Sequence, residues 1–530
     1  LQVVASTPAA PASSTAAPYG PAVAARFAEP STQYSTPGLA PERRGFTTNS
    51  ELGQWLHNIA NAAPRGPTQA SVLQLGASQQ GEPILGLLLT RAKGMDMASL
   101  EANGRSTVVL IGQQHGDEPA GSEALLVVAR ELAQGLLEPL LDRINVVVIP
   151  RANPDGATNG NRTTANGVDM NRDHLLLNTP EARALARVVR DYRPILVLDA
   201  HEFTVAGRYL QKFNAIQRYD ALLQYTTTAN YHEFLTKASQ EWYHQPMLGA
   251  LQSQGMSSEW YYTTSTQPDD KRISMGGVQP DTGRNVNGLK NAVSLLVETR
   301  GVGLGRLHIQ RRVHTQVTTI TSALRSTAER AADLEQVRSY VARDTASKAC
   351  KGQVVIEAQA TPMQRELTML DPDTGADRTL KVDWNSSLAL RPVKSRPRPC
   401  GYWLAAHATA AVERLQMLGV QVLRIAEPGA LLADTYHETA RETTERTDVR
   451  GTIAGGSSII RTQVTPVRSA IDVPAGSFYV PLNQGLAHLA VAALEPDTQS
   501  SYFANRLIDE LGSTARVMTV PSLVFEESDE

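Results

Sequence analysis

One stretch organises the chain: Val108-Val-Leu-Ile-Gly-Gln-Gln-His115-Gly-Asp-Glu118-Pro-Ala-Gly121. It begins as a short apolar run, which is typical of a buried strand, and residues 122–136 then follow a helical pattern. Between strand and helix lies a turn that carries His115 and Glu118, three residues apart. Polar groups at the carboxyl end of a parallel strand face the crevice in which α/β enzymes bind ligands. The stretch therefore predicts both an α/β fold and a site.

A second apolar run ends in the same way, Ile195-Leu-Val-Leu-Asp199-Ala-His201-Glu202. Histidine and carboxylate side chains both bind Zn²⁺, and a catalytic zinc has three protein ligands with water in the fourth position. A single His-x-x-Glu is a weak signal, because a loop histidine beside a glutamate is usually just solvated. His201 after a second strand strengthens it and makes His115, Glu118 and His201 a candidate metal site.

The composition of the chain limits the classes of protein to which it can belong. The 530 residues are 42% hydrophobic and 19% charged, which is typical of globular chains, and two or three domains are expected. The net charge of −3 gives no reason to expect a nucleic-acid partner. No stretch approaches the roughly 18 to 20 apolar residues of a membrane span.

The start of the chain and its cysteines suggest export. Residues 1–25 are rich in Ala, Pro, Ser and Thr, and the chain begins with Leu1, as after removal of a signal peptide. We therefore expect an exported protein, periplasmic or secreted. The chain has two cysteines, Cys350 and Cys400, which we expect to form a disulfide in an oxidising compartment and to remain thiols in the cytoplasm.

Strand and helix patterns alternate over the first two thirds of the chain. This predicts an α/β fold, a mixed but mainly parallel sheet with helices on both faces. The expected helices are 50–63, 122–136, 180–190 and a long one over 307–346, and the expected strands are a hairpin over 71–89 and the runs 107–112, 144–150, 195–199 and 293–298.

Three segments are expected. Residues 1–45 form a Pro/Ala-rich lead-in, extended and partly draped on the surface, and residues 46–348 form the catalytic domain. Residues 349–530 contain short alternating strands and two helical patterns, which predict a smaller accessory α+β domain. That last part shows no chemical motif.

Polar residues between and after the two strands complete a possible active site. Arg162 and the pair Asn171-Arg172 follow the turn Asn153-Pro-Asp-Gly156. An arginine binds a carboxylate through two parallel hydrogen bonds, so one could hold a substrate carboxylate while the other stabilises an oxyanion. Glu298 ends an apolar strand, where burying an unpaired carboxylate costs free energy. A catalytic role would explain its presence there, with the carboxylate taking a proton from the attacking water. The alternative is a structural pair with its neighbour Arg300.

Together these residues resemble the zinc carboxypeptidase family, the carboxypeptidase A-like metallopeptidases, in the form exported by bacteria. The resemblance covers about residues 50–305. It implies that His115, Glu118 and His201 bind one Zn²⁺ per chain and that Arg162 polarises the scissile carbonyl. It further implies that Asn171 and Arg172 grip the substrate's C-terminal carboxylate and that Glu298 is the general base and acid.

The chain departs from the family where an active-site tyrosine is expected. Arg272 stands near that position, and Tyr261 and Tyr262 are nearby candidates, so the three remain open. The run 278–285 also differs and either adds Arg284 to the pocket or forms a turn. The side-chain specificity of the family therefore does not carry over.

Three functions are compatible with these residues. The first is a zinc metallocarboxypeptidase that hydrolyses the C-terminal peptide bond of peptides. The second is a zinc-dependent amidase or deacylase acting on N-acyl amino acids or cell-wall peptides, which would use the same ligands and base. The third is a fold used for binding alone, which the complete set of ligands and base disfavours. The sequence does not give an oligomeric state.

Overall fold

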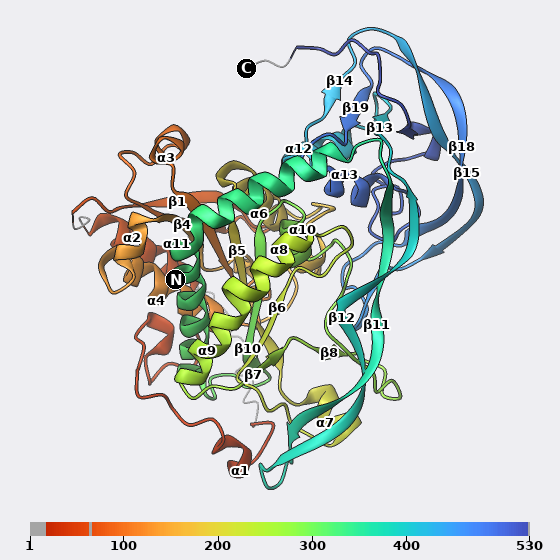
Figure 1. Cartoon of the computed structure of the whole chain (residues 1–530). Helices are drawn as coiled ribbons and strands as arrows, with labels where there is room; N and C mark the ends of the chain where they lie inside the picture. Colours follow the sequence, from red (N-terminus) through yellow and green to blue (C-terminus); the bar gives the residue numbers. More distant parts are fainter. Residues whose placement is uncertain (1–16, 63–65, 528–530) are drawn as a thin grey trace, which may run out of the picture.

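A computed structural model describes residues 17–62 and 66–527 (Figure 1). Most of the N-terminal segment expected to be extended, residues 1–16, lies outside the described residues. Its remainder contains the short helix α1 (Pro21–Ala24), and Tyr19, Val23 and Phe27 are buried in a hydrophobic cluster with β11 and β12. The described part of this segment is therefore packed into the protein.

The expected helices are present with small shifts at their ends, and further short helices lie between them. They are α1, α2 (Asn49–Asn61), α3 (Met97–Asn103), α4 (Ala120–Gln134), α5 (Pro154–Asn159), α6 (Pro180–Tyr192), α7 (Gly207–Phe213), α8 (Glu233–Ala238), α9 (Gln245–Ser253), α10 (Gly283–Gly288), α11 (Ile309–Ser347), α12 (Thr409–Met417) and α13 (Ala487–Leu494). Helix α2 begins at a capping box, in which Thr48 accepts from the backbone of Glu51 and Glu51 accepts from the backbone of Thr48.

The strands include all those expected. They are β1 (Gln69–Ala77), β2 (Pro83–Thr90), β3 (Ser106–Gly112), β4 (Ile144–Ile149), β5 (Leu196–Thr204), β6 (Ala221–Tyr225), β7 (Ser258–Trp260), β8 (Thr263–Thr264), β9 (Ile273–Ser274), β10 (Val293–Val302), β11 (Gln353–Leu370), β12 (Asp377–Pro397), β13 (Gly401–Leu404), β14 (Leu423–Arg424), β15 (Gly429–Thr444), β16 (Thr447–Asp448), β17 (Gly451–Thr452), β18 (Ile459–Val473), β19 (Phe478–Pro481) and β20 (Thr514–Val517).

The central sheet has eight strands in the order β1-β2-β4-β3-β5-β10-β6-β7. The pairs β3–β4, β3–β5, β5–β10 and β6–β7 are parallel, whereas β1–β2, β2–β4 and β6–β10 are antiparallel. The α/β fold with a mixed sheet is therefore as predicted. The parallel centre brings the carboxyl ends of β3, β5 and β10 to one edge.

Alternate residues of the central strands belong to two different cores. Val108 and Leu110 of β3 pack into a cluster with α2, α4, α8, α9 and α11, whereas Val109 and Ile111 pack with α3 and α6. Because successive side chains of a strand point to opposite faces, this division places helices on both faces of the sheet. The continuous apolar runs in the sequence are explained by this burial on both sides.

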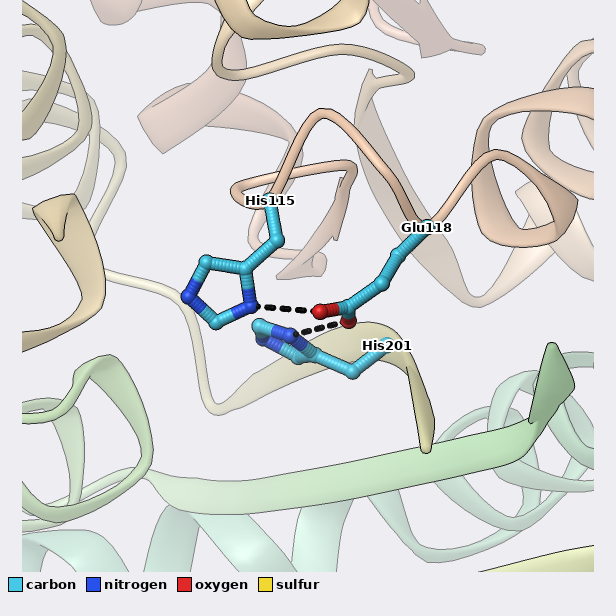
Figure 2. Close-up of side chains that lie close together, drawn as sticks. All are labelled: His115, Glu118 and His201. Atoms are coloured by element: carbon cyan, nitrogen blue, oxygen red, sulfur yellow. Dashed lines mark hydrogen bonds and ion pairs between the residues drawn. The ribbon is translucent and has the colours of Figure 1, made fainter. Parts of the chain in front are cut away.

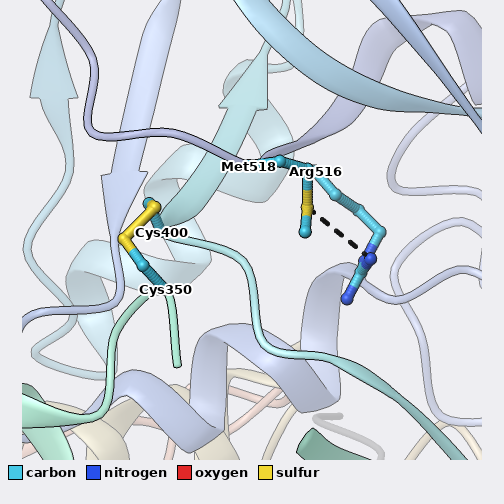
Figure 3. The surroundings of a disulfide bond; sticks show 4 residues. All are labelled: Cys350, Cys400, Arg516 and Met518. Atoms are coloured by element: carbon cyan, nitrogen blue, oxygen red, sulfur yellow. Dashed lines mark hydrogen bonds between the residues drawn. A yellow bond between two sulfur atoms is a disulfide. The ribbon is translucent and has the colours of Figure 1, made fainter. Parts of the chain in front are cut away.

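The C-terminal region is built from long β-hairpins and a six-stranded sheet of order β14-β19-β13-β20-β15-β18. The short runs expected over 354–358, 380–384 and 387–391 are parts of one long hairpin, β11–β12, which extends along the catalytic part (Figure 1). The expected disulfide is confirmed, since Cys350, just after α11, is bonded to Cys400, just before β13 (Figure 3).

Residues on both sides of the expected boundary at 348/349 share cores. Leu175 and Val286 pack in one cluster with Tyr402 and Leu489, and β12 pairs in parallel with β9. The domain division stays a prediction, but the C-terminal region is firmly packed on the catalytic part. Within residues 17–62 and 66–527, no helix combines the length and the apolar character that a membrane crossing requires.

Candidate active site

The carboxyl ends of β3 and β5 bring the predicted metal ligands together. The two strands are parallel neighbours, with Gly112 opposite Ala200, so the turn after β3 lies beside His201. That turn is tight at Gly116, where a Cβ atom would lie 2.0 Å from the carbonyl carbon of Gly156. A glycine is therefore required there for His115 to enter the site.

His115, Glu118 and His201 point toward one another, and all three are buried (Figure 2). His115 Nδ1 lies 2.7 Å from one carboxylate oxygen of Glu118, and His201 Nδ1 lies 3.1 Å from the other. Each residue offers a ligand atom within 4.8 Å of the others. Two imidazoles and one carboxylate are the donor set of a catalytic zinc site.

A second carboxylate lies beside each imidazole ring. The Nε2 atom of His115 lies 2.9 Å from Asp169, and the Nε2 atom of His201 lies 2.9 Å from Asp199. Such partners fix the tautomer, because the ring nitrogen facing the carboxylate carries the proton and the other is left to bind a metal. His115 fits this pattern, with Nε2 hydrogen-bonded to Asp169 and Nδ1 left for a metal. His201 does not, because its Nδ1 is hydrogen-bonded to Glu118, and its Nε2, although near Asp199, forms no hydrogen bond of acceptable geometry among the described residues. The spacing Asp199-x-His201 is a signal for this proximity in the sequence, because residues two apart on a strand share a face.

The negative charge and the free ring nitrogen of this cluster suit a bound cation. Burial opposes ionisation of Glu118, yet the two histidines hold the pKa of its carboxyl well below the usual range, so it is a carboxylate. Although His115 Nδ1 is close to that carboxylate, it forms no hydrogen bond of acceptable geometry within the described chain. A buried ring nitrogen of this kind is a ready metal ligand.

Glu298 lies beside the cluster on β10, directly opposite His201 in the parallel register of β5 and β10. It lines the same cavity, and burial raises the pKa of its carboxyl to about 7. The structural alternative, a pair with Arg300, does not occur. Arg300 instead donates to the backbone oxygen of Gln217 and lies over the ring of Phe27, 3.6 Å from its centroid.

The predicted substrate-binding residues line this cavity too. Arg162 is paired with Asp169 at 2.9 Å and lies 3.7 Å from Glu118. Asn171 accepts the backbone N–H of Gly283 through Oδ1, which leaves its amide nitrogen available. Arg172 donates through Nε to Asp448 and through Nη1 to the oxygen of Asn171, so its Nη2 remains available within the described residues.

Comparison with known proteins agrees with this arrangement. Residues 53–275 match the family described as zinc carboxypeptidase. Carboxypeptidase 2 of Trichophyton rubrum is 27% identical over 399 residues, which cover 74% of this chain and 72% of the relative. Carboxypeptidase D of Mus musculus is 29% identical over 228 residues, 35% of this chain and 16% of that protein. A solved metallo-carboxypeptidase from Pseudomonas aeruginosa has a TM-score of 0.38 at 18% identity, over 54% of this chain and 69% of that one.

Over residues 53–275, the chain resembles the zinc carboxypeptidases. It is accordingly a zinc metallopeptidase, as its residue pattern predicted. The bacterial origin that we expected is not confirmed, because the curated relatives named above are fungal and mammalian. The roles of individual residues remain predictions, which the geometry now makes specific.

Two of the three candidates for the active-site tyrosine lie at the cavity. Tyr261 lines the cavity, and burial, followed by the charge of Glu298, raises the pKa of its phenol to about 12, so the phenol is a hydrogen-bond donor at neutral pH. Tyr262 also reaches the lining, but its hydroxyl is hydrogen-bonded to Gln217. Arg272 does not line the cavity and pairs with Asp270 at the surface.

Further residues complete the cavity, of which Arg284 was an open alternative in the sequence and two others were missed. Arg284 lines it from α10, so the run 278–285 provides both a turn and an arginine. Val449 and Arg450 also line it, although they belong to the C-terminal region for which we expected no chemical role. No sequence motif predicts Val449 and Arg450 as site residues, because their position at the cavity depends on how the hairpin β15–β18 folds.

Proposed function

We propose that this metallopeptidase removes the C-terminal residue of peptides, with Glu298 as general base and acid. The observation that carries the proposal is one cavity lined by the metal-binding cluster, Glu298, Asn171 and Arg172. An enzyme specific for chain ends must recognise the free carboxylate, and the available nitrogens of Asn171 and Arg172 suit that group.

The protein groups divide the reaction between them. His115, Glu118 and His201 would hold a zinc ion, whose chemistry would be that of a Lewis acid toward the carbonyl and the attacking water. Glu298 takes the proton from the attacking water and returns it to the leaving amine. Arg162, charged and only partly exposed, can donate to the oxygen on which negative charge develops.

A pair of peptides tests the proposal. We expect an N-acylated tripeptide with a free C-terminal carboxylate to lose its last residue, whereas the same peptide with a C-terminal amide should be cleaved far more slowly. Equal cleavage of the two would overturn the carboxypeptidase assignment. Faster hydrolysis of a matching N-acyl amino acid than of the tripeptide would establish the deacylase alternative instead.

We also propose that the protein is exported. The Ala-, Pro-, Ser- and Thr-rich start of the chain and the Cys350–Cys400 disulfide support this. Fractionation of the native host, with thiol alkylation before lysis, provides the test. We expect the protein outside the cytoplasm with both cysteines oxidised, and a reduced protein in the cytoplasm would overturn the proposal.

A further inference from the structure

We propose that Arg450 makes this enzyme selective for peptides whose C-terminal residue has an acidic side chain. The inference rests on the proposed function, because it names the side chain that the same cavity accepts. It depends on the segment between β16 and β17, which the C-terminal region contributes and which lies outside the residues 53–275 matched by the family.

The backbone of Arg450 is fixed at the cavity. Its N–H donates to Asp448 Oδ1 at 2.8 Å, and its carbonyl oxygen accepts the N–H of Thr266 at 3.0 Å. The other carboxylate oxygen of Asp448 accepts from Arg172 Nε at 2.9 Å. Asp448 therefore links the segment that carries Arg450 directly to Arg172, which we predict to bind the C-terminal carboxylate of the substrate.

The side chain of Arg450 is unengaged. Within residues 17–62 and 66–527, its guanidinium has no carboxylate within 4.0 Å and donates to no acceptor, although the residue is partly buried and lines the cavity. A guanidinium presents five donors in a rigid planar fork, and leaving it partly desolvated without a partner is unfavourable. A ligand that accepts from this fork would remove that cost.

The contacts of the other cavity arginines indicate that Arg450 would bind a second anionic group of the substrate, besides its C-terminal carboxylate. Arg162 and Arg172 already have carboxylates, Asp169 and Asp448 respectively. Arg208 and Arg284 donate to protein oxygens but, like Arg450, form no ion pair among the described residues. Asp117, Glu118 and Glu298 also line the cavity, but no carboxylate of the described residues lies within ion-pair distance of Arg450. A side-chain carboxylate of Asp or Glu in the substrate would give Arg450 the partner that it lacks.

A matched peptide series tests this inference. N-acyl peptides that differ in their last residue alone, ending in Glu, Gln, Asp, Asn, Leu or Lys, are compared by kcat/KM. Glu and Gln have nearly the same shape, so their ratio isolates the charge. We expect Glu to exceed Gln by about ten- to a hundredfold, the usual gain of a hydrogen bond to a charged group, and Arg450→Gln to bring the ratio close to one.

Arg272→Gln provides the matched control, because it removes an equal charge from a surface arginine outside the cavity. It should keep the preference for Glu. Arg450→Lys should keep part of it, since a lysine retains the charge but not the fork. Thermal unfolding of each variant shows whether the fold is intact.

Binding to the Glu298→Gln variant separates this inference from the proposed function. Calorimetry with the dipeptides Ala-Glu and Ala-Gln should show tighter binding of Ala-Glu, by a factor that Arg450→Gln removes. Cleavage of the series without preference for Glu, or equal binding of the dipeptides, would overturn the role of Arg450. A Glu preference in binding, with no peptide cleaved by the wild type, would overturn the proposed function and leave the recognition of an acidic side chain standing.

Discussion

Glu298 on β10 stands opposite His201 on β5, residue against residue in a parallel register. This relationship places the predicted base next to a predicted zinc ligand through backbone hydrogen bonds of the central sheet. Such a base needs no loop movement to reach its place, because strands position side chains more rigidly than loops do. The predictions below test the parts of this arrangement separately.

Removal of one ligand should release the metal. We expect His201→Ala to lose most of its zinc, because two remaining protein ligands form a weak site. Metal content after gel filtration, measured by atomic emission, checks this, and His407→Ala is the control, since the His407 side chain is 62% exposed and far from the cluster in the chain. A full equivalent of zinc in His201→Ala would show that His201 is not a ligand.

Removal of the base should stop turnover but not binding. Glu298→Gln should retain zinc and bind substrate, yet lose several orders of magnitude in kcat, because an amide does not accept the proton. Pre-steady-state binding and kcat are measured on the same preparation. Near-normal turnover would remove Glu298 from the mechanism.

The state of Glu298 also predicts a pH dependence. Burial raises the pKa of its carboxyl to about 7, and a protonated carboxyl is no base, so activity should fall as the pH decreases. The positive charge of bound zinc lowers this pKa, so we expect the acid limb of kcat/KM for the zinc enzyme to have its midpoint below 7. An acid limb centred above that value would contradict the assignment.

Arg172 should determine the preference for a free carboxylate. We expect Arg172→Ala to cost about 3 to 5 kcal/mol in transition-state binding of free-acid peptides, on the order of a hundred- to several-thousand-fold in kcat/KM. Zinc content should be unchanged and amidated peptides should be affected far less. Asp448→Asn should act more weakly and mainly through KM, because it loosens the orientation of Arg172 without removing it.

A buried ion pair joins the active-site strand to helix α11. Arg312 donates two hydrogen bonds to Glu202, the neighbour of His201, and both side chains are almost completely buried. Arg312→Ala should lower the free energy of unfolding by about 3 to 5 kcal/mol, because it leaves a buried charge without a partner. Urea denaturation measures this. The exposed pair Arg330–Asp333 is the control, for which Arg330→Ala should change stability by about 0.5 kcal/mol or less.

The catalytic part was predictable because its signals are local. Each buried strand is a continuous apolar run, and His115, His201 and Glu298 follow such runs directly. Since parallel strands end at one edge, their juxtaposition follows from the pattern alone. The long helix expected over 307–346 is present as α11.

The C-terminal contribution was not predictable for a physical reason. β15 and β18 are largely exposed, so their sequences lack the alternation that marks a half-buried strand. Asp448 in the short strand β16 contacts Arg172, which ends a 3₁₀ helix, although the two residues are 276 positions apart in the sequence. Hydrophobic periodicity says nothing about such a pairing. Sequence motifs thus predict part of the cavity lining, whereas the contribution of the C-terminal region is evident only from the folded structure.

The disulfide between Cys350 and Cys400 affects what happens to the enzyme when another peptidase cleaves its chain. It closes the β11–β12 hairpin, including the turn at residues 371–376, into a covalent ring. A single cut anywhere in that ring opens it without separating the catalytic part from the segment that carries Arg450. The enzyme can therefore be cut within this hairpin and remain one covalent molecule, whereas a reduced molecule cut at the same place would be two chains held together by noncovalent contacts alone.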